Sequence, residues 1–379
     1  MARLFLHVGF HKTGTTNLQY LLSTNRTSLL KEGFLYPKTK RFRAHHDFAL
    51  ALSERKFGWQ DNGGKIVHRR HIKRIIRIIN RSRRDVIISS EFLSTLSAEK
   101  ISRLKGDIKK KEVKILFTLR PISKILPSAY QQEVKNGSKL QYEDWLSQIF
   151  GAKDNKLKTR VWGRHNHHQE ILKWTEVFGA ENVFVIISDE KNPDFLISEF
   201  MKVIGSSENI LNRNRKASLN RSLTVEELQL LLKINSEFDR NLGWQEYVNL
   251  VRGTFVKAWT DREPLSSSSN KLVNPAEFEE HIRSKANEIK RGLQMLNLNL
   301  IGDLESLQEV KIGILKKPTK IDIQNLVDPV MSRNIQNVLK NYSLAQLVRI
   351  KIDTSLRRFK KRNARKIKKL IPSRINQRV

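Results

Sequence analysis

Residues 4–16, LFLHVGFHKTGTT, contain the features from which the fold can be predicted. A short apolar run ends at Gly9, and after Thr16 leucines recur at Leu18, Leu21 and Leu22, which is helical spacing. A strand, a glycine loop and a helix in this order place backbone N–H groups and a helix N-terminus around one point. The stretch therefore predicts an anion-binding loop between a strand and a helix.

Later segments repeat the alternation of strand and helix. Apolar runs at residues 85–91, 113–120 and 182–190 are separated by helical patterns, such as Ile72, Ile75, Ile76 and Ile79 in a basic stretch. Pro121 is placed to begin another helix, which Pro127 should kink. Alternation of this kind is typical of α/β proteins with a parallel sheet flanked by helices.

The pattern becomes mostly helical beyond residue 205, with a capping box predicted at residues 224–227. We expect a P-loop-like α/β core over residues 1–205 and a helical lobe of the same domain over 206–310. A helical, basic extension should follow over 311–379. Within it, residues 355–379 hold 11 Lys and Arg and no acidic residue.

Composition narrows the class of protein. The formal net charge of +33, from 71 Lys and Arg against 38 Asp and Glu, favours nucleotides, polyanions or anionic membrane surfaces as partners. The absence of cysteine excludes a disulfide framework and thiolate chemistry. No apolar run reaches the roughly 18 residues of a membrane span, and too few residues precede Val8 for a signal peptide. We expect a cytoplasmic protein.

The position of the loop lysine separates this loop from an ATP-binding one. In the pattern G-x-x-x-x-G-K-[ST] the lysine directly follows the second glycine and reaches the β and γ phosphates. Here Gly9 and Gly14 keep the glycine spacing, but Thr15 follows and the lysine is Lys12. The cation is therefore expected beside whatever group is attached to the bound phosphate.

Residues Lys12, Thr13, Gly14, Thr15 and Thr16 resemble the K-[ST]-G-T-[TS] motif of the sulfotransferases that use 3′-phosphoadenosine 5′-phosphosulfate (PAPS). The resemblance covers roughly residues 1–205. It implies that these residues hold the 5′-phosphosulfate, and that Lys12 stabilises charge on the bridging oxygen as the sulfuryl group leaves. PAPS is then the co-substrate, and no metal is needed, because a sulfuryl group carries less charge than a phosphoryl group.

A second motif supports the same resemblance. The family holds the 3′-phosphate with an arginine at a strand end and a serine eight residues later, and Arg120 and Ser128 stand in that relation. A later basic contact has a loose counterpart in residues 212–220, with Arg213, Arg215, Lys216 and Ser218 as candidates. The opening stretch looks more like the bacterial and carbohydrate-type branches, which implies a hydroxyl of a carbohydrate or glycolipid as acceptor.

Transfer to a hydroxyl requires a general base near the acceptor. Glu91, at the end of a predicted strand, is the first candidate, and the alternative is that it caps the next helix. His45 and His46 are the competitors, and they could equally be ordinary loop histidines. A cluster of His165, His167 and His168 suggests a metal site, but only Glu170 adds a plausible ligand, so a solvated or substrate-facing cluster is favoured.

Two other functions remain open. Asp189 and Glu190 after an apolar run would fit a P-loop kinase or ATPase, although the lysine expected at position 15 is missing, and we take them as the polar end of an ordinary strand. The net charge would also suit a non-enzymatic polyanion-binding protein. Nucleic acid is not favoured, because no helix-turn-helix, RNP or zinc pattern is present. The tail at residues 357–379 could instead contact an anionic membrane surface.

Overall fold

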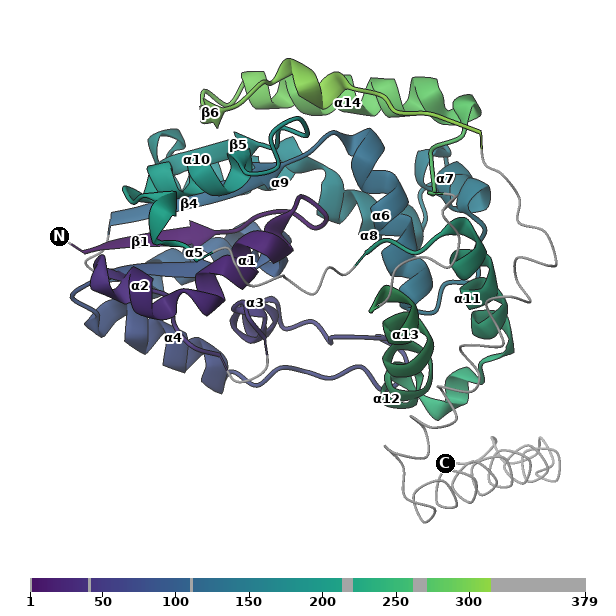
Figure 1. Cartoon of the computed structure of the whole chain (residues 1–379), viewed down its shortest axis with the longest axis horizontal. Coiled ribbons are helices and arrows are strands. Elements are labelled where there is room, and N and C mark those ends of the chain that lie inside the picture. The colour runs from purple at the N-terminus through teal and green to yellow at the C-terminus, as the bar shows by residue number, and fades with distance from the viewer. Residues whose placement is uncertain (1, 40–41, 110–111, 213–220, 262–270, 315–379) are drawn as a thin grey trace, which may run out of the picture.

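The computed structural model describes residues 2–39, 42–109, 112–212, 221–261 and 271–314 (Figure 1). Its centre is a six-stranded sheet in the order β2-β3-β1-β4-β5-β6, in which every neighbouring pair is parallel. The strands are β1 Arg3–His7, β2 Phe34–Leu35, β3 Asp85–Ser89, β4 Glu112–Leu119, β5 Val183–Ile187 and β6 Asn299–Ile301. The predicted α/β class with a parallel sheet flanked by helices is confirmed.

The strand order places β1 between β3 and β4. Leu6 lies opposite Ile88 of β3 on one side and Ile115 of β4 on the other. The chain completes the β3 side of the sheet before it crosses β1 to begin the β4 side, so the loop after β1 lies where the order reverses. In open parallel sheets the carboxyl ends of the strands at this switch point are where ligands bind.

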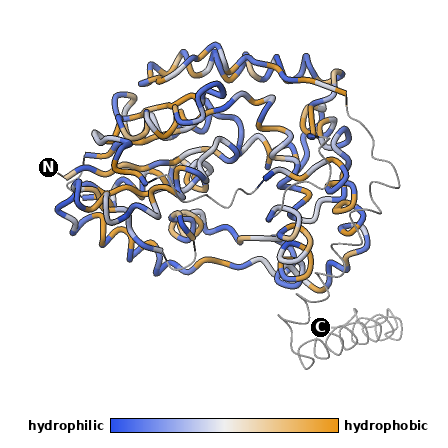
Figure 2. The backbone as a smooth tube through the Cα atoms, in the orientation of Figure 1, coloured by the Kyte–Doolittle hydropathy of each residue, from blue (hydrophilic) through white to orange (hydrophobic). Residues whose placement is uncertain are grey.

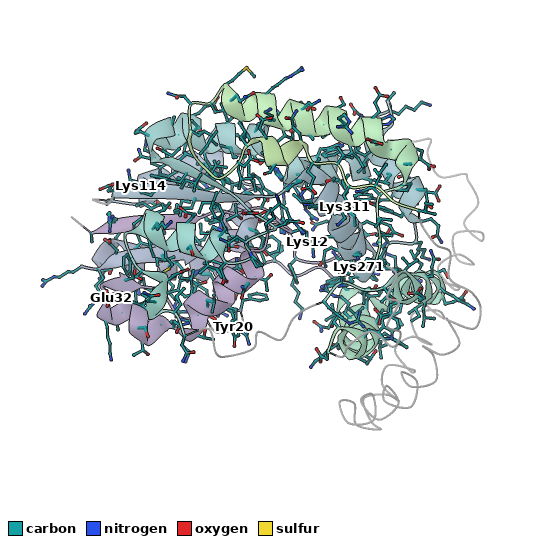
Figure 3. The ribbon with its side chains drawn as sticks, turned by 45° about the horizontal axis from the view of Figure 1, so that its top comes forward. Lys12, Tyr20, Glu32, Lys114, Lys271 and Lys311 are labelled. Carbon is teal, nitrogen blue, oxygen red and sulfur yellow. The ribbon has the colours of Figure 1, made fainter. Side chains whose placement is uncertain are left out.

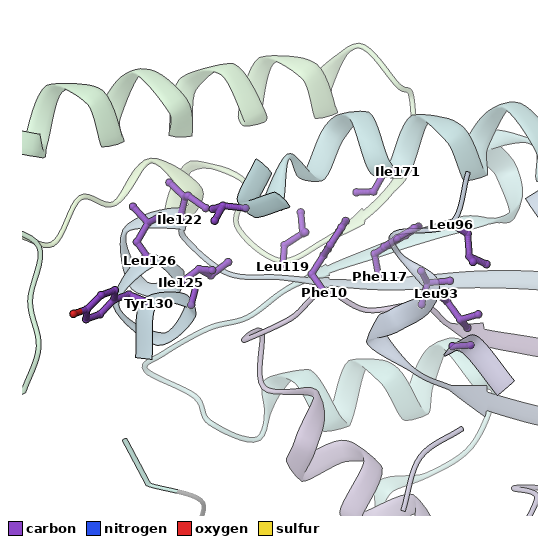
Figure 4. Packing of buried hydrophobic residues seen from close by; sticks show 14 of the residues in the cluster. Phe10, Leu93, Leu96, Phe117, Leu119, Ile122, Ile125, Leu126, Tyr130 and Ile171 are labelled. Carbon is purple, nitrogen blue, oxygen red and sulfur yellow. The ribbon is translucent and has the colours of Figure 1, made fainter. Parts of the chain in front are cut away.

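Helices cover both faces of the sheet because successive strand residues point to opposite sides. One face buries Phe5, Ile87 and Leu116 against the helices α1 Thr15–Thr24, α2 Arg26–Lys31 and α10 Phe195–Ile204. The other buries Leu6 and Phe117 against helices that include α3 His46–Ser53, α4 Arg70–Arg81, α5 Ala98–Asp107 and α9 His167–Phe178. Figure 2 shows hydrophobic colour along the strands and alternating colours along the helices, and Figure 4 shows the packing around Phe10 and Phe117.

Helix α6 Ile122–Lys135 continues through Pro127. Proline has no N–H, so it leaves the carbonyl four residues earlier, that of Ser123, without its helical partner. The Asn274 side chain donates from Nδ2 to that carbonyl at 2.7 Å and to the carbonyl of Lys311 at 2.7 Å, while its Oδ1 accepts from the Tyr142 hydroxyl at 2.7 Å. One buried amide therefore supplies the missing partner of the helix and connects it to Lys311, while the Ser123 hydroxyl donates to the carbonyl of Glu309 at 2.6 Å.

The remaining helices gather at the carboxyl end of the sheet and along one side of it (Figure 1). The capping box predicted at Thr224 and Glu227 is present at the start of α11. Strand β6 pairs with β5 although it lies beyond residue 205, where the α/β core was expected to end. The sheet therefore includes residues from the expected helical lobe. The elements are α7 Tyr142–Phe150, α8 Lys156–His165, α11 Val225–Glu237, α12 Trp244–Tyr247, the π-helix η5 Val248–Val256, α13 Lys257–Thr260 and α14 Glu279–Gln294.

Among the described residues, every helix is too short or too polar to span a lipid bilayer. The predicted basic extension lies outside the described residues from position 315 onward.

Candidate active site

The loop between β1 and α1 has three residues in the left-handed backbone region. These are Gly9, Lys12 and Gly14, with φ of 52°, 70° and 86°. A Cβ on Gly9 would lie 3.0 Å from Thr15 Cγ2 and 3.2 Å from His7 Nε2, so a side chain here would crowd both neighbours as well as strain the backbone. Lys12 has a side chain, so its left-handed conformation is strained, and strained residues of this kind are frequent at functional sites. Left-handed residues of this kind direct loop N–H groups toward a common point, where an anion can bind.

The threonines of the loop have different surroundings. The Thr13 hydroxyl donates to the carbonyl of Phe10 at 2.8 Å and lies 2.7 Å from the Thr118 hydroxyl of β4, which holds the loop onto the sheet. Thr15 is buried, whereas Gly14 and Thr16 are exposed. Within the described residues no side chain caps the N-terminus of α1 at Gly14. The exposed end of that helix is consequently open to an anion.

Lys12 lies where the sheet meets the helices that follow it (Figure 3). Its Nζ donates to Oε1 of Gln132 on α6 at 3.1 Å. Burial lowers the pKa of Lys12, the charge of Glu91 raises it, and the charge of Arg252 lowers it further. Its side chain has no ion pair among the described residues, which leaves its charge available to a bound anion.

Glu91 begins a 3-10 turn directly after β3, in contact with groups from two other elements. Gln19 of α1 donates from Nε2 to Glu91 Oε2 at 3.0 Å, and His46 Nδ1 lies 3.7 Å from the same oxygen. Burial alone would raise the pKa of Glu91, but the charges of His46 and His11 and the Gln19 hydrogen bond lower it. The group is therefore a carboxylate at neutral pH, which is the form that accepts a proton.

The two candidate histidines differ in what their rings contact. His45 is buried, with Nε2 3.0 Å from the carbonyl of Pro37, and its Nδ1 accepts from the Ser89 N–H at 3.1 Å. Burial lowers the pKa of His45 to about 3, so it stays neutral and both of its nitrogens bind main chain. His46 bonds through Nδ1 to the Ser90 hydroxyl at 2.9 Å and lies beside Glu91.

Arg120 follows β4 and binds a carboxylate of this chain. Its Nε and Nη2 donate to Glu190 Oε1 at 3.1 and 2.7 Å. Lys124 holds the other Glu190 oxygen at 2.7 Å and Glu309 at 2.6 Å. Glu190, taken from the sequence as the polar end of a strand, lies beyond β5 and is an ion-pair partner. Ser128 is four residues before Gln132 on α6, and therefore shares the helix face that meets Lys12.

The other predicted site residues are partly outside the described chain. Arg213, Arg215, Lys216 and Ser218 belong to the stretch 213–220, which lies outside the described residues. His165 ends α8, and His167 begins α9 with its ring 4.3 Å from that of Phe10. In the part of the chain that the structure describes, no three His, Cys, Asp or Glu residues are grouped to hold a metal ion.

Sequence reasoning missed four residues that the fold brings to this site: Gln19, Gln132, Lys135 and Arg252. Gln132 and Lys135 had a usable signal, because Gln132 follows Ser128 by four residues and Lys135 follows Gln132 by three, which is one helix face. Arg252 had no such signal, because its charge acts on Lys12 from a segment more than two hundred residues away in the sequence.

The fold and the loop together define an α/β protein with a glycine loop at the switch point of a parallel sheet. No family model matches the sequence, and no curated protein matches it. Among solved structures, the chain is similar to the crystal structure of a sulfotransferase from Alicyclobacillus acidocaldarius. The identity is 20%, the match covers 70% of this chain and 98% of that chain, and the TM-score is 0.40. A similarity this distant carries no chemistry, so any function must be argued from the residues.

Proposed function

We propose that this protein is a PAPS-dependent sulfotransferase that transfers a sulfuryl group to an acceptor hydroxyl, most simply that of a carbohydrate or glycolipid. The observation that carries the proposal is the strained Lys12, which has no ion-pair partner in the described part of the chain, in a loop whose N–H groups suit an anion. The charge of the Glu91 carboxylate acts on this lysine. A cation beside a carboxylate base is what an in-line transfer between two oxygens requires.

In the proposed reaction, the acceptor oxygen attacks sulfur from the side opposite the bridging oxygen. The bond from sulfur to that bridging oxygen breaks, and adenosine 3′,5′-bisphosphate leaves. Lys12 stabilises the negative charge that grows on the bridging oxygen, while Gly14, Thr15, Thr16 and the start of α1 hold the 5′-phosphate. Thr13 maintains the loop through its bond to the carbonyl of Phe10.

Glu91 takes the acceptor proton in this scheme. We prefer it to His46 because Nδ1 of that ring already bonds to the Ser90 hydroxyl, and to His45 because both nitrogens of that ring bind the main chain. Arg120 and Ser128 are assigned the 3′-phosphate. Because Glu190 now holds Arg120, the phosphate must displace that carboxylate, and its greater charge favours the exchange.

The loop also leaves a kinase or ATPase as the competing function, and nucleotide preference separates the two. We expect adenosine 3′,5′-bisphosphate to raise the melting temperature without metal, because a ligand at a hundred times its Kd stabilises the folded state by about 2.7 kcal/mol. ATP with Mg²⁺ should do so far less. A larger shift with ATP and Mg²⁺, or none with the bisphosphate, would contradict the sulfotransferase proposal.

Cytoplasmic location and contact of residues 357–379 with an anionic membrane surface remain part of the proposal. Their support is the sequence alone, through the surplus of Lys and Arg in the tail. Removal of residues 357–379 should weaken binding to vesicles containing phosphatidylserine, and unchanged binding would dispose of the contact.

A further inference from the structure

Three cations lie along α6 beside the candidate active site: Lys12, Lys135 and Arg252. Two neutral amides link the outer pair. Lys12 Nζ donates to Gln132 Oε1 at 3.1 Å, Gln132 Nε2 donates to Asn136 Oδ1 at 3.3 Å, and Arg252 Nη1 donates to that same Oδ1 at 3.1 Å. Lys135 is the last residue of the helix, between these two amides in sequence. The three side chains are each half-buried.

The acidic residues near this cation row are engaged elsewhere. Glu227 attracts Lys135, but both of its oxygens accept from Arg221, at 2.6 and 2.8 Å. Burial and the charges of Lys12 and Arg252 lower the pKa of Lys135 to about 8. Within the described ranges, none of the three cations has an ion-pair partner. Half-buried like charges without counterions are costly in free energy, and a bound anion would remove that cost.

The Arg252 end of the row is held in place before any ligand arrives. Arg252 lies in the π-helix η5, a rare conformation that is frequent at functional sites, and its guanidinium lies 5.5 Å from the centre of the Trp244 ring. Trp59 donates to the carbonyl of Asn136 at 2.7 Å and packs against Trp244 with ring centres 5.5 Å apart. Groups fixed in this way lose little entropy on binding, which raises affinity.

The row extends away from the part of α6 assigned to the nucleotide. At a rise of about 1.5 Å per residue, Lys135 lies roughly 10 Å beyond Ser128 along the helix. The 3′-phosphate and the 5′-phosphosulfate already account for Ser128, Arg120 and Lys12 in the proposed function. That assignment leaves Lys135 and Arg252 without a nucleotide group to bind, and the other molecule in the transfer is the acceptor.

We propose that Lys135 and Arg252 bind an acidic group of the acceptor, so that the preferred substrate is a hydroxyl compound carrying a carboxylate or sulfate ester, such as an acidic sugar. This specificity rests on the proposed function. Asn136 and Gln132 position the cations and could also donate hydrogen bonds to the acceptor. A neutral sugar would leave both charges without a partner and bind less tightly.

The test compares two probes that differ in one group, 4-nitrophenyl β-D-glucuronide and 4-nitrophenyl β-D-glucoside. Calorimetric binding to the full chain saturated with adenosine 3′,5′-bisphosphate should favour the glucuronide by on the order of tenfold or more. Lys135→Gln and Arg252→Gln should each remove most of that preference. Arg283→Gln is the matched control, because Arg283 pairs with Glu279 on the exposed surface of α14, and it should change nothing.

Lys135→Arg keeps the charge and should keep the preference, which guards against a loss caused only by misfolding. A pH series adds a second readout. Lys135 faces Lys12, Arg252, Arg221 and Glu227, and because its pKa is lowered to about 8, it loses its proton as pH rises through 8. Glucuronide affinity should fall over that range in the wild type, and this decline should be absent in Lys135→Gln.

Four outcomes would overturn this specificity: equal affinity for the two probes, binding of neither, a preference that survives both glutamine variants, or loss of bisphosphate binding in either variant. The last would assign the cations to the nucleotide. Failure of the proposed function is distinct, because it is measured by the bisphosphate thermal shift. A wild type that ignores the bisphosphate, tested with the probes alone, would still support the anion site if it prefers the glucuronide through Lys135 and Arg252.

Discussion

Replacing Lys12 should separate activity from stability. Lys12→Ala removes the one loop cation, and loss of a preorganised transition-state donor typically lowers turnover by about 10² to 10³, or about 2.7–4 kcal/mol. Lys12→Gly makes the same chemical deletion and also relieves the left-handed strain at φ 70°, worth about 1–2 kcal/mol per residue. Both changes also remove a half-buried charge. The glycine variant should therefore be inactive and melt higher than the alanine variant, by on the order of 2 °C.

Two measurements check this. Thermal melting compares Lys12→Gly and Lys12→Ala, with Asn297→Gly as the control, because Asn297 is exposed, has φ of 46° and lies outside the site. Turnover is followed as release of adenosine 3′,5′-bisphosphate from PAPS, with 4-nitrophenyl β-D-glucuronide as acceptor. Full turnover in Lys12→Ala would refute the role of this cation in the reaction. A glycine variant less stable than the alanine variant would refute the account of strain.

Three further changes test other contacts. Glu190→Gln should free Arg120 and tighten adenosine 3′,5′-bisphosphate binding several-fold by titration calorimetry; unchanged affinity would argue against Arg120 as a phosphate ligand. Glu91→Gln should lower turnover by about 10² to 10⁴ with the bisphosphate affinity unchanged, and an active variant would move the base elsewhere. Asn274→Ala should cost about 2–3 kcal/mol in urea unfolding, because it leaves the carbonyl of Ser123 buried without a partner; a smaller loss would mean that water replaces the amide.

The sheet was predictable because its four central strands are short apolar runs that alternate along the chain with helical patterns. This alternation is typical of a parallel sheet flanked by helices. The edge strands were not, because β2 and β6 have only two and three residues and derive their conformation from pairing with β3 and β5. Pro127 is a helical example of a feature that depends on distant residues. Its missing hydrogen bond is readable from the sequence, but the amide that compensates for it comes from Asn274, far along the chain.

Within the site, the local motif was enough to predict the loop, whereas the residues around the loop come from distant parts of the chain. The glycine spacing and the displaced lysine specify where Lys12 stands, because strand, turn and helix are adjacent in sequence. That spacing does not show that Gln132 accepts a hydrogen bond from Lys12, or that Glu190 forms an ion pair with Arg120. It also does not show that the charge of Arg252 acts on Lys12. Such contacts depend on how separate helices pack, which a single sequence does not reveal.

The attachment of residues 309–313 to α6 sets a limit on how the chain can be shortened. Ending the polypeptide before residue 309 would remove Glu309, whose carboxylate pairs with Lys124 and whose carbonyl accepts from the Ser123 hydroxyl. It would also remove the carbonyl of Lys311, which accepts from Asn274. A truncation before residue 309, intended only to delete the basic tail, would then also remove a partner of Lys124, which binds the same Glu190 carboxylate as Arg120. A truncation that keeps residues 1–314 retains these contacts, so its effects can be assigned to the tail alone.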